Sequence, residues 1–263
     1  MASGRSRLGI IAGLVAAAAA LFLLEYRMGY ITGYRVPGGG VPMVRSPSLR
    51  LDLRQALGLQ DFYSQLGQDK WIVGNVYPGV TDGYFVDVGS WDAEIDSNSK
   101  ALEELGWTGV CVDPFPQNWK NRTCRLFEEV AYARAGEIVR FRAAGQLGGI
   151  DEHLGFWKDD VQEYPIVELR TTTLADILGR AGAPPFIHYL SIDIEGSELD
   201  ILAALPFERY TIGAITVEHN FEQPKRARIR ALLESKGYQR VREQLVDDFY
   251  LLPAAVGAQR GGR

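Results

Sequence analysis

Several features that define common protein classes are missing from this sequence. It has only two cysteines, Cys111 and Cys124, which are too few for a disulfide framework and lack the spacing of metal ligands. No long basic run accompanies the net charge of −5, which argues against nucleic acid as the main partner because phosphate binding needs clustered Lys and Arg. The 46% of apolar residues nevertheless supply a large core, so a folded domain is expected.

A dinucleotide-binding loop would need glycines that this chain does not have. The segment YFVDVGSWDAEIDSN, residues 84–98, carries the apolar run of a buried strand followed by a single glycine, Gly89. The loop that cradles a dinucleotide pyrophosphate follows the pattern G-x-G-x-x-G. The segment therefore predicts a ligand that carries no diphosphate.

Short apolar runs alternate with helical segments from residue 84 onward. The expected strands are Tyr84–Val88, Val110–Asp113, Phe127–Ala131, Ile187–Asp193 and Ala214–Glu218. The expected helices are Ser97–Leu105, Thr172–Ala181, Ser197–Leu205 and Lys225–Lys236. Short strands separated by helices predict an α/β fold, with a parallel sheet covered on both faces.

Two segments depart from this alternation. Around Gly136, the run AYARAGEIVRF predicts a local hairpin extension. Near the C-terminus, YQRVRE and DDFYLLP are two strands with no helix between them, which predicts a closing antiparallel strand on an otherwise parallel sheet. That closing strand is typical of a methyltransferase sheet and not of a plain dinucleotide-binding sheet.

The ends of the first two expected strands indicate a cofactor. Ligands of an open parallel sheet sit outside the carboxyl ends of the strands. The first strand ends in Asp87-Val88-Gly89-Ser90, and the second ends in Val112-Asp113-Pro114. An acidic residue roughly 20–25 positions beyond the glycine loop suits the two hydroxyls of a ribose. The carboxylate of Asp87 can accept from an ammonium group, and that of Asp113 can accept from the ribose hydroxyls. Together they fit S-adenosylmethionine, an adenosine ligand with an amino-acid tail. Helix capping is the alternative role for Asp87 and Asp113.

Further polar residues are candidates for the same ligand. The run YSQLGQDKWI, residues 63–72, precedes the first strand, and its alternative interpretation is a helix capped by Ser64. The expected cofactor-binding residues are Gln68, Asp87, Gly89, Ser90, Asn98 and Asp113.

Acidic and amide side chains gather after the fourth and fifth expected strands. Asp193 follows the fourth strand, and Glu218, His219 and Asn220 end the fifth. Buried carboxylates are costly unless they hold a cation, a proton or a substrate hydroxyl. We therefore expect Asp193, Glu218 and His219 to be catalytic. Asp193, Glu218 and Asn220 also form an oxygen-rich set that suits Mg²⁺ or Mn²⁺, whereas His219 is an alternative general base.

The N-terminal region predicts attachment to a membrane. Leu8–Leu24 is an uncharged apolar run that follows Arg5 and Arg7, as in a signal anchor, while a cleaved signal peptide is the alternative. The expected organisation is an anchor over residues 1–25, a linker over 26–50, a catalytic domain over 51–255 and a disordered tail over 256–263.

Six segments, taken together and in order, resemble the FkbM-type methyltransferase domain. They are SQLGQD, GYFVDVGSWDAEIDSNSKALEELGWTGVCVDPFP, RTTTLADIL, LSIDIEGSELDIL, ITVEHN and DDFYLL. The match runs from about Ser64 to Leu252, across most of the chain that follows the expected anchor and linker. The resemblance implies a seven-stranded, Rossmann-like methyltransferase that uses S-adenosylmethionine, usually on hydroxyl oxygens of sugars, lipids or natural products.

The resemblance also assigns residues by position. Asp87 and Gly89 match the family's cofactor loop, Asn98 the Ser-Asn that follows it, and Asp113 the ribose acid, where many members carry Glu. Two further acidic segments of the family are matched by Asp193, Glu195, Glu218 and Asn220. The chain departs from the pattern at Trp91-Asp92-Ala93, where members often carry a second glycine.

These features together predict a membrane-tethered O-methyltransferase. Its substrate would be a hydroxyl of a small molecule, a glycan or a lipid. Because its cofactor is made in the cytosol, the catalytic domain is expected there, or in the Golgi lumen of a eukaryotic secretory pathway. The alternative is a non-catalytic, membrane-anchored adaptor or trafficking protein that keeps the fold. The intact acidic strand ends favour the enzyme.

Overall fold

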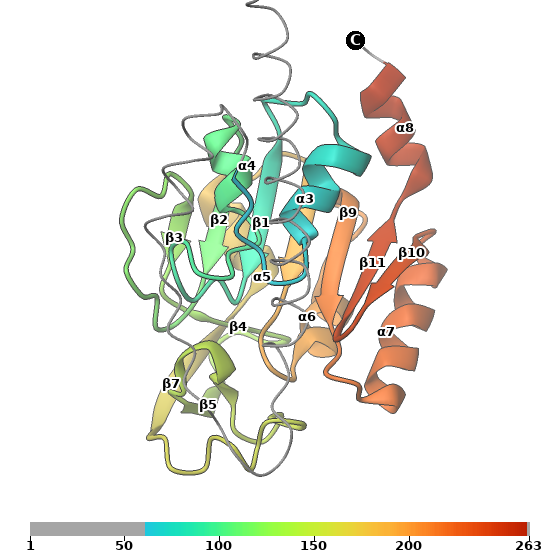
Figure 1. The fold of residues 1–263 in the computed structure, drawn as a ribbon. Helices are drawn as coiled ribbons and strands as arrows, with labels where there is room; N and C mark the ends of the chain where they lie inside the picture. Colours follow the sequence, from blue (N-terminus) through green and yellow to red (C-terminus); the bar gives the residue numbers. More distant parts are fainter. Residues whose placement is uncertain (1–60, 262–263) are drawn as a thin grey trace, which may run out of the picture. The chain divides into compact units, whose positions relative to one another are not determined.

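The computed structural model describes residues 61–261, which form two β-sheets with helices around the larger one (Figure 1). The larger sheet has seven strands in the spatial order β10 (Gln239–Gln244), β11 (Asp247–Leu251), β9 (Thr211–Glu218), β8 (Phe186–Ile192), β1 (Tyr84–Val88), β2 (Thr108–Val112) and β3 (Arg125–Phe127). Only β11 runs antiparallel to its neighbours in this sheet. The predicted seven-stranded, mostly parallel α/β sheet is therefore confirmed.

Side chains that alternate along each strand divide the core between two faces of the sheet. Val86 and Val88 of β1 pack in one cluster with side chains from α5 (Leu174–Ala181), α6 (Glu198–Ala204) and α7 (Gln223–Ser235). Phe85 packs in the other cluster, with side chains from α3 (Gln68–Trp71), the π-helical turn η1 (Ile72–Val76), α4 (Lys100–Glu104) and α8 (Pro253–Gly261). Both faces are covered, as a parallel sheet requires.

The smaller sheet corrects one prediction. Its order is β4 (Val130–Tyr132), β7 (Ile166–Thr173), β5 (Ile138–Arg142) and β6 (Gly149–Ile150), with the single 3₁₀ turn η2 (Gly145–Leu147) leading into β6. The hairpin expected around Gly136 is wrong, because β4 and β5 pair with opposite edges of the longer β7 and not with each other. The expected strand Phe127–Ala131 is likewise split, since Phe127 ends β3 in the large sheet and Val130 begins β4 in the small one.

Two predicted boundaries also move, for identifiable reasons. The helix expected over Ser97–Leu105 begins only at Lys100, because the side chains of Asn98 and Ser99 are bonded to strands β8 and β1. At the C-terminus, α8 extends to Gly261 where a disordered tail was expected from residue 256, and Val256 is buried in the core.

The two cysteines form a disulfide that the sequence analysis did not predict. Cys111 in β2 is bonded to Cys124, which lies just before β3, and both side chains are buried. The bond joins β2 to the loop that precedes β3.

The predicted anchor and linker, residues 1–50, lie outside the described residues. Within residues 61–261, no helix is long and apolar enough to cross a membrane. The membrane anchor therefore stays a prediction.

Candidate functional site

The loop after β1 approaches the end of β8 so closely that only glycine fits. Gly89 has φ +88°, and its N–H donates to the carbonyl of Val112 at 2.9 Å. A Cβ atom at this position would lie 1.6 Å from the backbone oxygen of Asp193. Glycine is thus required at this position for two reasons: the backbone is left-handed, and there is no room for a Cβ atom beside the residue that follows β8.

Two pockets meet at this loop, along the carboxyl ends of β1, β2 and β8. The first, here the apolar pocket, is lined by residues that include Val112, Asp113, Val130, Phe141 and Ile150. The second, here the polar pocket, is lined by residues that include Asp87, Ser90, Asp96, Ser97 and Asn98. Both pockets share Gly89, Trp91, Gln146 and Asp193, so they adjoin and can hold one ligand with an apolar and a polar part.

Asp113 is one of the three carboxylates that line the apolar pocket, together with Glu129 and Asp193. Its Oδ1 accepts from the N–H of Phe115 at 2.7 Å, and its Oδ2 accepts from the N–H of Trp91 at 3.0 Å. Burial raises the pKa of Asp113 to about 6, with the nearby Asp87 charge adding to the effect. Each oxygen keeps a lone pair for a further donor, such as a ribose hydroxyl.

The polar pocket presents acceptors and a hydroxyl that the protein leaves unused. Asp87 Oδ2 accepts from the hydroxyl of Ser99 at 2.5 Å, and burial raises the pKa of Asp87 above its usual range. Asn98 donates its amide to Ser191 Oγ at 2.9 Å, but its Oδ1 has no hydrogen-bond partner in the described part of the chain. The buried hydroxyl of Ser90 also has none among residues 61–261. Buried polar atoms without partners are rare and indicate a ligand.

Four carboxylates gather beside the polar pocket, and we call Asp193, Glu195, Glu218 and Asp247 the acidic cluster. Oxygen atoms of Asp193, Glu195 and Glu218 all lie within 4.8 Å of one another. The amide of Asn220 donates to Glu195 at 2.8 Å and to Glu218 at 2.7 Å. The pKa of each carboxyl is raised, mainly because it is buried and further because its neighbours are acidic.

Comparison with known proteins gives one match. The model of the methyltransferase FkbM domain matches residues 87–240, which is more than half of the chain. The chain belongs to the FkbM methyltransferase family. Membership implies a methyltransferase that uses S-adenosylmethionine, as the sequence resemblance predicted. The chain matches no curated protein and no solved structure at a significant level.

Within this FkbM domain, five of the six predicted cofactor residues lie in the two pockets. Asp113 lines the apolar pocket, Gly89 lines both, and the polar pocket takes Asp87, Ser90 and Asn98. Gln68 does not line either pocket. Its Oε1 accepts from the N–H of Leu66 at 3.0 Å, and its Nε2 donates to Asp247 at 2.5 Å, so both ends of the amide are already used.

The segment around Gln68 differs from its predicted alternative as well. Gly67, with φ +77°, occupies the N-cap position of helix α3 in place of Ser64. The hydroxyl of Ser64 nevertheless accepts from the N–H of Asp69 in the first turn at 3.4 Å and donates to Asp69 Oδ1 at 2.5 Å. Asp69 is fully buried and also accepts from the backbone N–H groups of Tyr63 and Ser64. The side chain of Asp69 therefore organises the turn before α3.

Asp247 is a member of the acidic cluster that the sequence analysis missed. It lies opposite Glu218 in the pairing of β11 with β9. Because β11 is antiparallel, its first residue reaches the edge at which the parallel strands end. The segment DDFYLL was recognised as part of the resemblance, and its opening acid together with the predicted antiparallel strand was the signal that could have identified this residue.

His219 points away from the acidic cluster. Its Nδ1 accepts from the N–H of Phe221 at 3.1 Å, and its Nε2 lies 3.9 Å from an oxygen of Asp248. Burial, with the Arg226 charge adding to it, lowers the pKa of His219 to about 4. The imidazole is thus neutral. Its Nδ1 is used in a turn, whereas its buried Nε2 has no hydrogen-bond partner within the described residues. Because the nitrogen that accepts is already used, the geometry does not favour His219 as the general base.

Trp91 and Asp92 take the place of the second glycine found in many family members. Trp91 has φ +25°, borders both pockets, and its buried Nε1 has no partner within the described residues. Asp92 accepts from the N–H groups of Glu94 and Ile95, each at 2.9 Å, and from the amide of Asn118 at 2.7 Å. Asp92 therefore closes the turn, and Trp91 offers a donor at the junction of the pockets.

Proposed function

We propose that this protein is an O-methyltransferase that transfers the methyl group of S-adenosylmethionine to a hydroxyl of a sugar, a glycolipid, or a lipid-linked or natural-product substrate. The observation that carries the proposal is the pair of adjoining pockets beside the acidic cluster. An apolar pocket that contains the Asp113 carboxylate suits adenosine. A polar pocket with unused acceptors and a hydroxyl suits an amino-acid tail.

The unused atoms of the polar pocket match the two ends of that tail. The ammonium group needs acceptors, which Asp87 and the Oδ1 of Asn98 supply. The carboxylate needs donors, which the hydroxyl of Ser90 and the Nε1 of Trp91 supply. Gly89 and Asp193 lie where the pockets meet, so the sulfonium methyl group would lie next to the acidic cluster.

Asp193 is the best-placed residue to take the proton of the substrate hydroxyl. It borders both pockets and is the least buried of the three clustered carboxylates Asp193, Glu195 and Glu218. Its pKa is raised by burial and by neighbouring acids, so its carboxylate is a stronger base than an exposed one. The hydroxyl oxygen attacks the methyl carbon as the carbon–sulfur bond breaks. The proton passes to Asp193, and S-adenosylhomocysteine remains.

The acidic cluster also fits a divalent metal ion. Asp193, Glu195 and Glu218 bring hard oxygen donors together while burial disfavours their charges, and a cation relieves that cost. These three residues would hold Mg²⁺ or Mn²⁺, with Asn220 turning its unpartnered oxygen toward the ion in place of its amide nitrogen. A bound ion would lower the pKa of a coordinated hydroxyl.

An exposed aromatic surface near the cluster supports an acceptor with apolar ring faces, such as a pyranose. Phe221 directly follows Asn220, and its ring lies 6.0 Å from that of Phe156. The two side chains are 42% and 53% exposed, although large aromatic side chains are usually buried. The rings offer a stacking surface that the acceptor would use while its hydroxyl faces Asp193.

We further propose that residues 8–24 tether the enzyme to a membrane and that its domain lies either in the cytosol, where the cofactor is made, or in the Golgi lumen of a secretory pathway, where the Cys111–Cys124 disulfide would persist. The support for the tether is the uncharged apolar run, and the arginines on both sides of it allow either orientation. Fractionation tests the tether, since the full chain should sediment with membranes and a chain lacking residues 1–50 should not. Protease protection of a C-terminal tag then reports on which side of the membrane the domain lies.

Calorimetry with S-adenosylhomocysteine tests the proposed function. We expect binding by the wild type and a loss of at least about tenfold in affinity for both Asp87→Ala and Asp113→Ala. Asp193→Asn should keep the affinity and abolish methyl transfer to sugar hydroxyls. Absence of binding by the folded wild type would instead support the adaptor alternative. Full activity in excess EDTA would remove the ion from the mechanism.

A further inference from the structure

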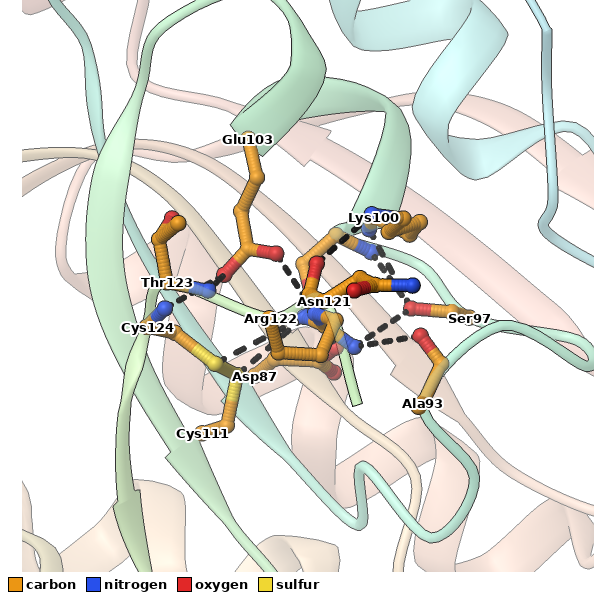
Figure 2. Close-up of a disulfide and its surroundings, with 11 residues drawn as sticks. Asp87, Ala93, Ser97, Lys100, Glu103, Cys111, Asn121, Arg122, Thr123 and Cys124 are labelled. Carbon is orange, nitrogen blue, oxygen red and sulfur yellow. Dashed lines mark hydrogen bonds and ion pairs between the residues drawn. A yellow bond between two sulfur atoms is a disulfide. The ribbon is translucent and has the colours of Figure 1, made fainter. Parts of the chain in front are cut away.

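The guanidinium of Arg122 is buried between Glu103 and the loop that carries Ala93 and Ser97 (Figure 2). Its side chain is 0% exposed, and its Nε pairs with Glu103 Oε2 at 2.6 Å. The Nη1 atom donates to the carbonyl of Ala93 at 2.9 Å and to Ser97 Oγ at 3.2 Å, while Nη2 donates to Ser99 Oγ at 2.7 Å. The guanidinium, which we call the fork, thus binds Glu103 of helix α4 and three residues of a single loop.

That loop forms the wall of the polar pocket. Residues 89–99 run from the end of β1 to the start of α4, and Ser97 lines the polar pocket directly. Ser99 accepts from Arg122 and donates its own proton to Asp87 Oδ2. Arg122 therefore reaches Asp87 through one hydroxyl, and its positive charge lies where it favours the ionised form of that carboxyl.

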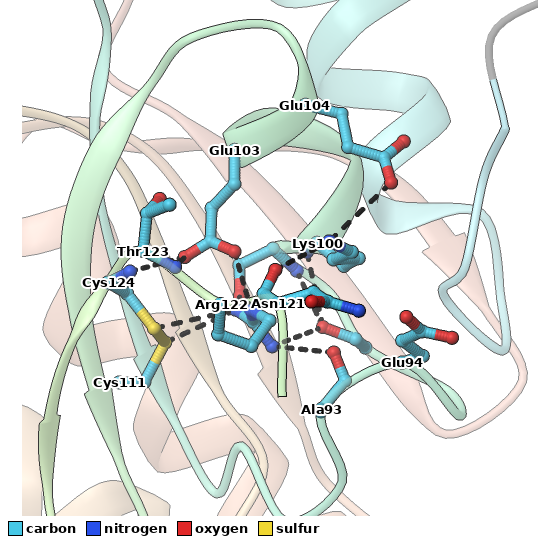
Figure 3. A network of polar contacts seen from close by, with 12 residues as sticks. Ala93, Glu94, Lys100, Glu103, Glu104, Cys111, Asn121, Arg122, Thr123 and Cys124 are labelled. Atoms are coloured by element: carbon cyan, nitrogen blue, oxygen red, sulfur yellow. Dashed lines mark hydrogen bonds and ion pairs between the residues drawn. A yellow bond between two sulfur atoms is a disulfide. The ribbon is translucent and has the colours of Figure 1, made fainter. Parts of the chain in front are cut away.

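Arg122 is itself fixed from several sides (Figure 3). Its Nη2 lies 3.3 Å from the sulfur of Cys111 and 3.6 Å from that of Cys124, the two atoms of the disulfide. The second oxygen of Glu103 accepts from the N–H groups of Thr123 and Cys124 at 3.1 and 2.5 Å. The disulfide and Glu103 thus pin the short segment that carries Arg122 to β2 and α4.

A buried ion pair alone does not account for this arrangement. Arg122 and Glu103 could neutralise each other's charge without any contact to the pocket loop. A buried ion pair is also weak evidence of a stabilising role. The remaining donors of the fork instead go to Ala93, Ser97 and Ser99, all on the pocket loop. A guanidinium is suited to this task because its donors have a fixed geometry, which lysine lacks.

We propose that Arg122 is a positioning residue that sets the polar-pocket loop in its ligand-binding shape, and that the Cys111–Cys124 disulfide holds Arg122 in place. This inference rests on the proposed function, in which the polar pocket takes the amino-acid tail of the cofactor. It predicts that loss of the fork weakens binding of the tail and leaves binding of the adenosine part unchanged.

Two probes that differ only in the tail test the idea. S-adenosylhomocysteine carries the amino acid, and 5′-methylthioadenosine lacks it. We measure both affinities by calorimetry on the full chain, for the wild type and for Arg122→Lys, which keeps the charge that faces Glu103. We expect the Kd of S-adenosylhomocysteine to rise about tenfold and that of 5′-methylthioadenosine to change by less than about twofold. Arg125→Lys, a change at an exposed arginine nearby, is the matched control and should change neither.

A second variant tests the disulfide and covers the case in which Arg122→Lys does not fold. The double variant Cys111→Ala/Cys124→Ala keeps the Arg122 guanidinium but removes the disulfide that holds it in place. The Kd of S-adenosylhomocysteine should then rise about threefold to fivefold with the other probe again unaffected.

The outcomes separate the inference from the proposed function. Equal weakening of both probes would show that Arg122 only stabilises the fold, and unchanged affinities in both variants would equally overturn the positioning role. A wild type that binds neither probe would overturn the proposed function, and the inference with it.

Discussion

Replacement of Gly89 by alanine should disable the site, and the structure gives the size of the effect. The added Cβ would lie 1.6 Å from the backbone oxygen of Asp193, whereas such contacts normally begin near 3.0 Å. The difference, 3.0 − 1.6, means that the oxygen or the loop must move by about 1.4 Å. Alanine at φ +88° adds backbone strain of about 1 kcal/mol. Displacing packed backbone adds about 1–3 kcal/mol, so we expect a total of about 2–4 kcal/mol.

The matched control is Gly79→Ala. Gly79 has φ +75°, but a Cβ there would meet nothing among the described atoms within 4 Å. The control therefore carries the backbone strain without the collision. For a domain of this size, 1 kcal/mol lowers the melting temperature by about 2–4 °C. We expect a loss of about 2–4 °C for Gly79→Ala and of about 4–16 °C for Gly89→Ala.

Thermal unfolding and calorimetry with S-adenosylhomocysteine measure the two effects. Gly79→Ala should bind as the wild type does. Gly89→Ala should lose at least about tenfold in affinity, because the displaced loop borders both pockets. The prediction is wrong if Gly89→Ala has the same melting temperature as Gly79→Ala and its Kd for S-adenosylhomocysteine is within about twofold of the wild-type value.

Three further predictions follow from the same geometry. Asp113 has a pKa of about 6, so its ionised form, which accepts hydrogen bonds, is lost below that pH. Calorimetry should therefore show the Kd of 5′-methylthioadenosine rising about tenfold between pH 7 and pH 5. The variant Asp113→Asn should show no such pH dependence. Burial raises the pKa of Glu218 above its unfolded value, so the native state prefers the protonated form and loses stability as pH rises from about 4.5 through the folded pKa. Urea unfolding at pH 8 should therefore give Glu218→Gln a free energy of unfolding about 1–3 kcal/mol higher than that of the wild type, with little difference at pH 4. The variant should also have lost its activity. An equal difference in stability at both pH values would contradict this. Phe221→Ala should raise the KM for a sugar acceptor several-fold while calorimetry finds the affinity for S-adenosylhomocysteine unchanged, and a weakened cofactor would refute the stacking role.

The fold was predictable because its signals are local. Alternating strands and helices, and two final strands without a helix between them, indicate the sheet and its antiparallel member. The small sheet was not predictable in the same way. Its central strand β7 begins at Ile166, far along the chain from β4 and β5, so the pairing depends on contacts that no local pattern encodes.

The site was predictable where a residue directly ends a strand. Asp87, Asp113, Asp193 and Glu218 do so, and the structure places all four at one edge of the sheet. His219 and Gln68 show the limit of this reasoning, because sequence position does not tell which way a side chain turns. The Cys111–Cys124 bond was missed since two cysteines set no pattern, and only the pairing of β2 with β3 brings them together.

The place of β11 has a consequence for how the molecule is made. Among the strands of residues 61–261, this one comes last in the chain, yet it lies between β9 and β10, and its first residue completes the acidic cluster. A nascent chain that ends before residue 247 lacks both the strand that joins β9 to β10 and the carboxylate to which Gln68 donates. Such a chain has an open edge on β9 and an unfinished site. Completion of the large sheet and maturation of the proposed catalytic centre are therefore one event, which requires that residues 247–251 have left the ribosome.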